Sequence, residues 1–219
     1  MKLVLFDCDG TLVDSAGLIH EVMRRTFIQY GHQAPSLDDT KSIIGLTLDI
    51  AIARLLGRPH ADGECVEMMA HYKSIYADVR SESGAIDRLF DGIRDVIAEL
   101  AERDDVIIGA VTGKSRRGLD LILDTHDWRR HFFVSRTADD CPSKPHPAMV
   151  SECCDEAGIS PADTIVIGDA IYDMQMAKAA DATAIGVSWG YASTNALWQA
   201  GADAVVDQPA MLLSYIHKG

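Results

Sequence analysis

Three short apolar runs divide the chain, and each is followed closely by a polar residue. The runs cover residues 2–6, 106–111 and 164–167. Asp7 follows the first run, Thr112 follows the second, and Asp169 comes just after the third. Uninterrupted runs of β-branched and other aliphatic residues predict strands that are buried on both faces of a sheet. We therefore expect the three runs to form strands inside one sheet.

The rest of the pattern indicates how that sheet is covered. Weaker strand patterns occur at residues 132–135, 183–187 and 204–206, and helical patterns occur near residues 90–102, 115–125, 147–157 and 171–180. Strands that alternate with helices predict an α/β fold, a doubly wound, Rossmann-like parallel sheet with helices on both faces. Ligands bind beyond the carboxyl ends of such strands. Asp7, Thr112 and Asp169 are thus expected at one edge.

The strand pattern disappears between Asp14 and about Gly84. Apolar residues recur there at helical spacing, namely Leu18, Ile19, Val22, Met23 and Phe27, then Leu48, Ile52, Leu55 and Leu56, then Met69, Tyr72, Ile75, Tyr76 and Val79. Such spacing predicts amphipathic helices. We therefore expect an α-helical cap over residues 15–84, inserted into an α/β core formed by residues 1–14 and 85–219.

Composition and charge limit the classes of partner. The chain has 219 residues, of which 47% are hydrophobic and 24% charged, as in an ordinary globular protein. The formal net charge of -13 argues against a nucleic-acid partner, because phosphate contacts need clustered lysine and arginine. The same charge repels anionic substrates. A phosphate site in this chain therefore needs local cations.

The cysteines and the first residues bear on the compartment. Five cysteines without paired metal-ligand spacing do not predict a disulfide framework, which favours a reducing compartment. Asp7 and Asp9 interrupt the first apolar run too early for a signal peptide or a membrane span. A cytoplasmic protein without a membrane partner is expected.

The segment Asp7-Cys8-Asp9-Gly10-Thr11 places two carboxylates at the mouth of the first predicted strand. Acids this close strain each other's ionisation and attract a cation. Taken alone, the segment also fits an Asx-rich turn. A helix-loop-helix calcium site is excluded, since Gly10 comes too soon and no glutamate closes the loop.

The segment Thr112-Gly113-Lys114-Ser115 closes a predicted strand and opens a predicted helix. A hydroxyl, backbone amides and the helix dipole can converge on an anion there. Alone, the segment also fits an ordinary helix cap. A Walker loop is disfavoured, because only three residues separate Gly109 from Gly113.

Two later segments add a lysine and two more acids. Prolines follow Lys144 and restrict the turn that carries it. Asp169 and Asp173 lie four residues apart at a strand end and the start of a helix. Together with Asp7 and Asp9, they offer the all-oxygen donor set that Mg²⁺ prefers.

In this order, the four segments resemble the motifs of the haloacid dehalogenase superfamily, in particular its phosphoglycolate-phosphatase-like members. The resemblance covers nearly the whole chain and includes a small helical cap after the first strand. The later segment Gly186-Val187-Ser188-Trp189-Gly190 is also similar to that branch. The resemblance implies a Mg²⁺-dependent phosphatase that acts on a small phosphorylated metabolite.

The resemblance also implies a role for each motif residue. Asp7 would be the nucleophile that forms an aspartyl-phosphate, and Asp9 would protonate the leaving alcohol and then activate water. Mg²⁺ would be held by Asp7, the Asp9 carbonyl and Asp169, with support from Asp173. The phosphoryl oxygens would be bound by Thr112, the Gly113 amide and Lys144.

Alternatives remain open at this level. Dehalogenation is disfavoured, because dehalogenases that resemble this chain lack the acid matched by Asp9. A phosphosugar mutase would carry a histidine soon after the first motif, but His20 falls one position late, which on a helix turns it by about 100°. A non-catalytic binding module is disfavoured, since each catalytic position holds a competent residue.

The substrate is expected to be chosen by the cap, where the loop at residues 44–47 around Gly45 faces the leaving group in related proteins. Phosphoglycolate, sugar phosphates and nucleotides all remain possible substrates. The oligomeric state is not predicted by any pattern in the sequence.

Overall fold

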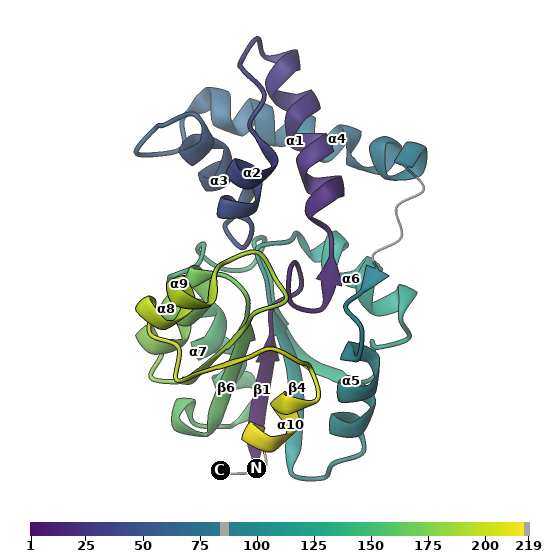
Figure 1. Cartoon of the computed structure of the whole chain (residues 1–219), viewed down its shortest axis with the longest axis vertical. Coiled ribbons are helices and arrows are strands. Elements are labelled where there is room, and N and C mark those ends of the chain that lie inside the picture. Colours follow the sequence, from purple (N-terminus) through teal and green to yellow (C-terminus); the bar gives the residue numbers. More distant parts are fainter. Residues whose placement is uncertain (84–87, 217–219) are drawn as a thin grey trace.

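A computed structural model describes residues 1–83 and 88–216, and it contains a parallel sheet covered by helices on both faces, with further helices beyond one end of the strands (Figure 1). In the described part, the sheet has six strands in the order β5-β4-β1-β6-β7-β8. The strands are β1 (Lys2–Phe6), β4 (Val106–Val111), β5 (Phe132–Arg136), β6 (Thr164–Gly168), β7 (Thr183–Val187) and β8 (Ala204–Val206). The predicted α/β class is confirmed, and the three apolar runs are neighbouring strands inside the sheet.

Strand β1 is the point at which the winding of the chain reverses. It pairs in parallel with β4 on one side and with β6 on the other. The chain builds β4 and β5 on the first side and then crosses to build β6, β7 and β8 on the second. Ligand sites in doubly wound sheets lie beyond the carboxyl ends of the strands at such a reversal. Asp7 directly follows β1.

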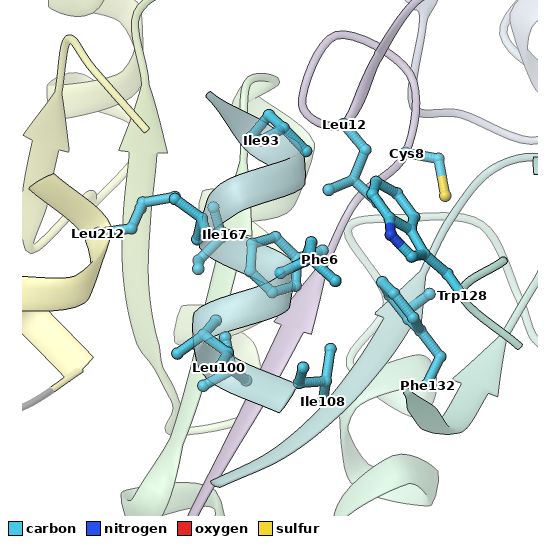
Figure 2. Close-up of a cluster of buried hydrophobic side chains, with 14 of the residues drawn as sticks. Phe6, Cys8, Leu12, Ile93, Leu100, Ile108, Trp128, Phe132, Ile167 and Leu212 are labelled. Atoms are coloured by element: carbon cyan, nitrogen blue, oxygen red, sulfur yellow. The ribbon is translucent and has the colours of Figure 1, made fainter. Parts of the chain in front are cut away.

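Two hydrophobic cores sandwich the sheet, because successive side chains of a strand point to opposite faces. Val4 and Phe6 point into one core, whereas Leu3 and Leu5 point into the other. The first core is covered by α5 (Ile93–Ala101), α6 (Arg116–Thr125) and α10 (Met211–Ile216), and the second by α7 (Ala148–Ala157), α8 (Ile171–Ala179) and α9 (Thr194–Gln199). Figure 2 shows Phe6 of β1 among side chains of the first core. Burying each such side chain contributes roughly 1.5–3 kcal/mol.

The stretch from Ala16 to Ser83 folds into four helices: α1 (Ala16–Gln29), α2 (Leu37–Ile43), α3 (Leu48–Leu55) and α4 (Gly63–Ser83). We call them the helical cap. They bury a third core of their own, which also takes in Ala170 and Tyr172 from the first part of α8 and the residue before it. The cap lies beyond the carboxyl ends of the strands (Figure 1).

The chain enters and leaves the helical cap through a pair of short strands. β2 (Val13–Asp14) and β3 (Arg88–Leu89) are antiparallel, with Val13 opposite Leu89 and Asp14 opposite Arg88. The predicted boundary between residues 84 and 85 lies outside the described residues.

Outside the cap, three short helical segments of the described chain have no counterpart in the predicted pattern. Helices α9 and α10 span six residues each, and a single 3-10 turn spans Pro161–Asp163. Segments of this length are too short to establish a helical period in the sequence. Within residues 1–83 and 88–216, no helix is long and apolar enough to span a bilayer.

Candidate active site

The predicted site residues meet at the carboxyl ends of neighbouring strands. Asp7 directly follows β1, Thr112 follows β4, and Asp169 follows β6. Lys144 lies on the loop between β5 and α7, and Asp173 lies in the first turn of α8. The parallel register of the sheet therefore brings together segments that are far apart in the sequence.

Three carboxylates form a buried acidic cluster. Oxygen atoms of Asp7, Asp169 and Asp173 lie within 4.8 Å of one another, and all three side chains are buried. Like charges repel strongly at this distance when water is excluded. The cluster therefore needs cations or protons to compensate its charge.

Lys144 supplies one compensating charge. Its Nζ lies 2.8 Å from Asp7 Oδ1 and donates a hydrogen bond of 2.6 Å to Asp173 Oδ1. The other oxygen of Asp173 accepts a hydrogen bond of 3.0 Å from the Ala170 backbone nitrogen. Burial alone would lower the pKa of Lys144, but the charges of Asp173 and Asp7 raise it above its usual range. Asp173 thus fixes a charged ammonium group beside Asp7.

Asp7 has the fewest hydrogen-bond partners of the three acids among the described residues. Burial raises its pKa to about 7, although Lys144 opposes the shift. Among the described residues, neither carboxylate oxygen of Asp7 accepts a hydrogen bond of good geometry, even with the Lys144 ammonium nearby. A buried carboxylate in this condition is unfavourable unless it binds a cation or a proton. Both Asp7 oxygens are therefore available for chemistry or for a metal ion.

Asp169 is held between two backbone segments. Its Oδ1 accepts a hydrogen bond of 3.1 Å from Thr11 Oγ1, and its Oδ2 accepts one of 2.8 Å from the Tyr191 backbone nitrogen. A Cβ atom at Gly10 or Gly190 would lie only 2.2 Å from Asp169, so no side chain fits at either position. The carboxylate is thus oriented before any ligand arrives.

The donors of the acidic cluster fit a hard divalent cation such as Mg²⁺. This ion prefers oxygen ligands and usually binds one or two carboxylates while it keeps several waters. Neither Asp7 oxygen accepts a hydrogen bond of good geometry from the described residues, and burial together with the charges of Asp7 and Asp173 raises the pKa of Asp169 well above its usual value. A cation would relieve both carboxylates. Asp173 is already engaged by Lys144 and Ala170.

Asp9 lies outside the acidic cluster and has a lysine of its own. Its Oδ1 accepts a hydrogen bond of 2.7 Å from Lys114 Nζ and a short one from Ser15 Oγ. Both of these hydrogen bonds are made to Oδ1 and neither to Oδ2. Asp9 is therefore fixed through one oxygen and presents the other.

Thr112 and Gly113 form a turn under the helical cap. The Thr112 backbone nitrogen donates to the Arg136 carbonyl at 3.0 Å, and Thr112 Oγ1 accepts from the Lys114 backbone nitrogen at 3.2 Å. A Cβ atom at Gly113 would lie 2.6 Å from the carbonyl oxygen of Leu46 in the cap. Glycine at this position allows the cap backbone to approach the turn.

Side chains of the α/β core hold the helical cap through hydrogen bonds. Ser143 Oγ accepts a hydrogen bond of 2.9 Å from the Thr47 backbone nitrogen. Tyr172 donates from its hydroxyl to the Ser42 carbonyl at 2.9 Å and accepts a hydrogen bond from Arg54, whose guanidinium lies 5.2 Å from the ring centroid. The loop around Gly45 is thus held close to the site.

The first cap helix begins in an unusual way. Serine at a helix N-cap normally accepts a hydrogen bond from the first turn. The Ser15 hydroxyl makes no such bond and donates to Asp9 instead. The Tyr191 hydroxyl of the core accepts hydrogen bonds of 3.0 Å from the Ser15 and Ala16 backbone nitrogens. The Tyr191 hydroxyl therefore caps the backbone N–H groups at the start of α1 in place of the Ser15 hydroxyl.

Sequence reasoning assigned no role to Lys114, Ser15 or Tyr191. Lys114 lies inside a segment that was singled out for its hydroxyl and amides, and the need for local cations in a chain of charge -13 was a signal for it. No local pattern marks Ser15 or Tyr191. Cys8, between the two acids, is buried, and burial raises the pKa of its thiol, so it is not a reactive group here.

Comparison with known proteins links this geometry to a family. Residues 4–187 match the family model of the haloacid dehalogenase-like hydrolases. A phosphoglycolate phosphatase of Pseudomonas putida is 28% identical over 193 residues, which cover 87% of this chain and 70% of the relative. A phosphoglycolate phosphatase of Xylella fastidiosa is 29% identical over 218 residues, which cover 96% and 91%.

Solved structures share the fold. A hydrolase from Pseudomonas syringae superimposes with a TM-score of 0.85 at 20% identity and covers 100% of this chain and 99% of its own. A candidate β-phosphoglucomutase from Bacteroides vulgatus has a TM-score of 0.80 at 22% identity, covering 100% and 91%. The same arrangement of sheet and cap thus occurs in proteins of more than one named activity.

Proposed function

The chain belongs to the haloacid dehalogenase-like hydrolase family and its curated relatives are named phosphatases, and from this premise we propose that it is a Mg²⁺-dependent phosphomonoesterase that works through an aspartyl-phosphate. Its substrates are small phosphorylated metabolites of the kind that phosphoglycolate phosphatases hydrolyse. The observation that carries the proposal is the Asp7 carboxylate, which is buried at the end of β1 and ion-paired with Lys144, and whose oxygens accept no hydrogen bond of good geometry from the described residues.

The first half of the reaction uses Asp7 as nucleophile. One carboxylate oxygen attacks the phosphorus atom, the bond from phosphorus to the ester oxygen breaks, and an acyl phosphate forms on Asp7. The Lys144 ammonium, the Thr112 hydroxyl and the Gly113 amide stabilise the phosphoryl oxygens as their charge is redistributed. Bound Mg²⁺, held by Asp7, the Asp9 carbonyl and Asp169, would supply further positive charge there.

Asp9 handles the protons in both halves. It donates a proton to the departing alkoxide, so that a neutral alcohol leaves. It then takes a proton from water as the water oxygen attacks the acyl phosphate, which releases inorganic phosphate and restores the Asp7 carboxylate. Ser15 and Lys114 hold Asp9 Oδ1, which leaves Oδ2 for these transfers.

The helical cap contributes by excluding bulk water. Its contacts through Thr47 and Ser143, and through Tyr172, hold it against the core. A site closed in this way strengthens the electrostatic interactions inside it.

Two observations favour a cytoplasmic enzyme without nucleic-acid partners. All five cysteines are free and buried, as expected for a reducing compartment. The net charge of -13 opposes binding to a polyanion. Both features fit a metabolic enzyme that acts on small molecules.

The mutase alternative has weaker support. It rests on a fold shared with the Bacteroides vulgatus protein at 22% identity. His20, the histidine near the first motif, lies 2.9 Å from Thr40 within the cap, and Asp9 is bound by Ser15 and Lys114 instead. The phosphatase is therefore the function that the geometry supports best.

A panel of phosphomonoesters tests the proposal. The protein should release inorganic phosphate from small esters with Mg²⁺ present and lose this activity when EDTA removes the metal. A β-hexose-1-phosphate with a trace of the bisphosphate is included in the panel. Faster formation of hexose-6-phosphate than of free phosphate would establish the mutase, and no turnover of any ester would reject the proposed function.

A further inference from the structure

One segment of the helical cap contacts the core right beside the site residues. This α2–α3 segment, residues 42–47, covers the last two residues of α2 and the link to α3. Its contacts with the core include Gly113, Ser143, Ala170 and Tyr172. Each of these is adjacent in the sequence to a residue of the site, namely Thr112, Lys144, Asp169 and Asp173. The cap therefore rests on the same short segments that carry the site.

Ser143 joins the α2–α3 segment to the loop that carries Lys144. Its Oγ accepts a hydrogen bond of 2.9 Å from the Thr47 backbone nitrogen, and its carbonyl accepts one of 3.0 Å from the His146 backbone nitrogen. Lys144 thus lies inside a turn whose first residue is bonded to the cap. The sheet sets where this loop lies, but Lys144 itself follows β5 by eight residues and belongs to no strand.

Ala170 and Tyr172 join the same segment to Asp173. The Tyr172 hydroxyl donates to the Ser42 carbonyl at 2.9 Å, and both residues pack in the hydrophobic core of the cap. The Ala170 backbone nitrogen also donates to Asp173 Oδ2 at 3.0 Å. Asp173 is therefore bonded to one residue on which the cap rests and directly follows another.

The two connections meet at one ion pair. Lys144 Nζ donates to Asp173 Oδ1 at 2.6 Å, and both side chains are 0% exposed. The same ammonium group lies 2.8 Å from Asp7 Oδ1. A group that binds a substrate must be held within about 0.5 Å of its productive position. The α2–α3 segment holds the backbone beside both members of the pair, so it restricts where this ammonium group lies.

We propose that Ser143 and Tyr172 are positioning residues that couple the seating of the α2–α3 segment to binding of the phosphoryl group. With the segment seated, they hold Lys144 and Asp173 in the arrangement that binds the phosphoryl oxygens. With the segment lifted, the phosphoryl group is bound less tightly. The inference rests on the proposed phosphatase function and adds the residues by which the cap acts at phosphorus. The coupling does not involve the leaving alcohol, so it extends to inorganic phosphate.

Hydrogen exchange of the wild-type protein tests the coupling without turnover. Linkage is reciprocal: if the seated segment tightens phosphate binding, bound phosphate stabilises the seated segment to the same degree. With Mg²⁺ present, inorganic phosphate should slow exchange of the Thr47 N–H roughly 2- to 10-fold, the range expected for one neutral hydrogen bond. The Asp39 N–H, which donates to Ser36 within the cap, is the reference and should not change.

Variants test whether the coupling runs through these two hydroxyls. Ser143→Ala and Tyr172→Phe should each raise the inhibition constant of inorganic phosphate roughly 2- to 10-fold. Ser143→Thr keeps the hydroxyl and should stay close to the wild type. Tyr191→Phe is the matched contrast, because it removes a hydroxyl that binds the start of α1 on the Asp9 side. It should leave the inhibition constant unchanged.

Several results would overturn the proposal. Unchanged Thr47 exchange at a phosphate concentration that inhibits hydrolysis would do so, and so would equal phosphate inhibition of the wild type, Ser143→Ala and Tyr172→Phe. Inhibition of Tyr191→Phe or Ser143→Thr as weak as that of Ser143→Ala would show that these hydroxyls are not the link. The phosphatase itself is judged separately, since failure of the wild type to hydrolyse any ester would reject that function.

Discussion

Two lysine–aspartate centres lie side by side in this site, and they differ in how they are enclosed. On the phosphoryl side, by which we mean Asp7, Lys144, Asp169 and Asp173, the Lys144 side chain is 0% exposed and its two partners are 1% and 0% exposed. On the alcohol side, by which we mean Asp9, Ser15 and Lys114, the lysine and aspartate side chains are each 10% exposed.

The difference follows from the elements that carry each side. The phosphoryl side is built from the ends of β1 and β6 and the start of α8, with Lys144 between them, so its geometry is set by the sheet. The alcohol side takes in Ser15, the residue just before the first cap helix. Under the proposed function, the part that binds the phosphoryl group of every ester is thus fully buried, and the part that meets the variable alcohol borders the cap.

The largest expected effect is that of Asp7→Asn. The amide is a poor nucleophile and removes a metal ligand, so kcat should fall by at least about 10³-fold. The loss should be the same for every ester of the panel, since phosphorus chemistry is common to all. Phosphate release is measured for each ester, with exposed Asp155→Asn as the control. Activity close to the wild type would remove Asp7 from the phosphoryl side.

Lys144→Met tests the difference in burial. Asp7 and Asp173 would lose their shared counter-ion in a fully buried site, and breaking a buried ion pair typically lowers the free energy of unfolding by about 3–5 kcal/mol. Lys114→Met should lower it less, because Asp9 is partly exposed and keeps Ser15. Urea unfolding without metal measures both. A loss for Lys114→Met as large as that for Lys144→Met would show that the two centres are equally enclosed.

The pH dependence of stability is a third test, made on metal-free protein. Burial raises the pKa of Asp7 from 3.8 to about 7, so the folded state binds a proton that the unfolded state releases. This contribution to stability is complete below pH 4 and is lost as the pH rises through about 7. The raised pKa of Asp169 acts in the same direction.

Asp7→Asn isolates the part due to Asp7. The variant should match the wild type in urea unfolding near pH 4 and exceed it in stability near pH 8, because the amide never ionises. Parallel curves for both proteins between pH 4 and pH 8 would contradict the raised pKa.

Tyr191→Phe should have the smallest effect. It removes the hydroxyl that accepts hydrogen bonds from Ser15 and Ala16, and losing an N-terminal helix cap costs about 1 kcal/mol. Because Ser15 also holds Asp9, kcat should fall modestly while the Mg²⁺ requirement stays unchanged. Metal titration and urea unfolding check both parts, with the more exposed Tyr215→Phe as control. A raised Mg²⁺ requirement would place Tyr191 on the phosphoryl side instead.

Much of this architecture was accessible from the sequence. The apolar runs predicted strands inside one parallel sheet because such strands are buried on both faces, and the residues after them were expected at one edge. The family was predicted from four short motifs, and the match over residues 4–187 confirms it. The assignment of roles to Asp7, Asp9 and the other motif residues stays a prediction.

Contacts between distant segments were not accessible in the same way. Tyr191 reaches the start of α1 because the segment after β7 contacts the loop after β1, where Trp189 donates to the Thr11 carbonyl. No pattern in the residues around Tyr191 predicts that contact. A serine before a helix ordinarily caps it, but the Ser15 hydroxyl donates to a carboxylate six positions earlier in the sequence. Such pairings depend on tertiary geometry, which local periodicity does not contain.

The antiparallel pair of β2 and β3 brings the two ends of the cap segment together. Asp14 and Arg88 lie opposite each other where the chain leaves the core and returns, and opposite residues of such a pair have α-carbons about 4.5–5.5 Å apart. A two-residue hairpin turn such as Asn-Gly closes a gap of this size. A gene with that turn in place of codons 15–87 would encode the α/β core without the cap, and it would also remove Ser15, which holds Asp9. An insert that keeps Ser15 could therefore replace the rest of the helical cap, the part that meets the alcohol under the proposed function, and leave every strand of the six-stranded sheet unchanged.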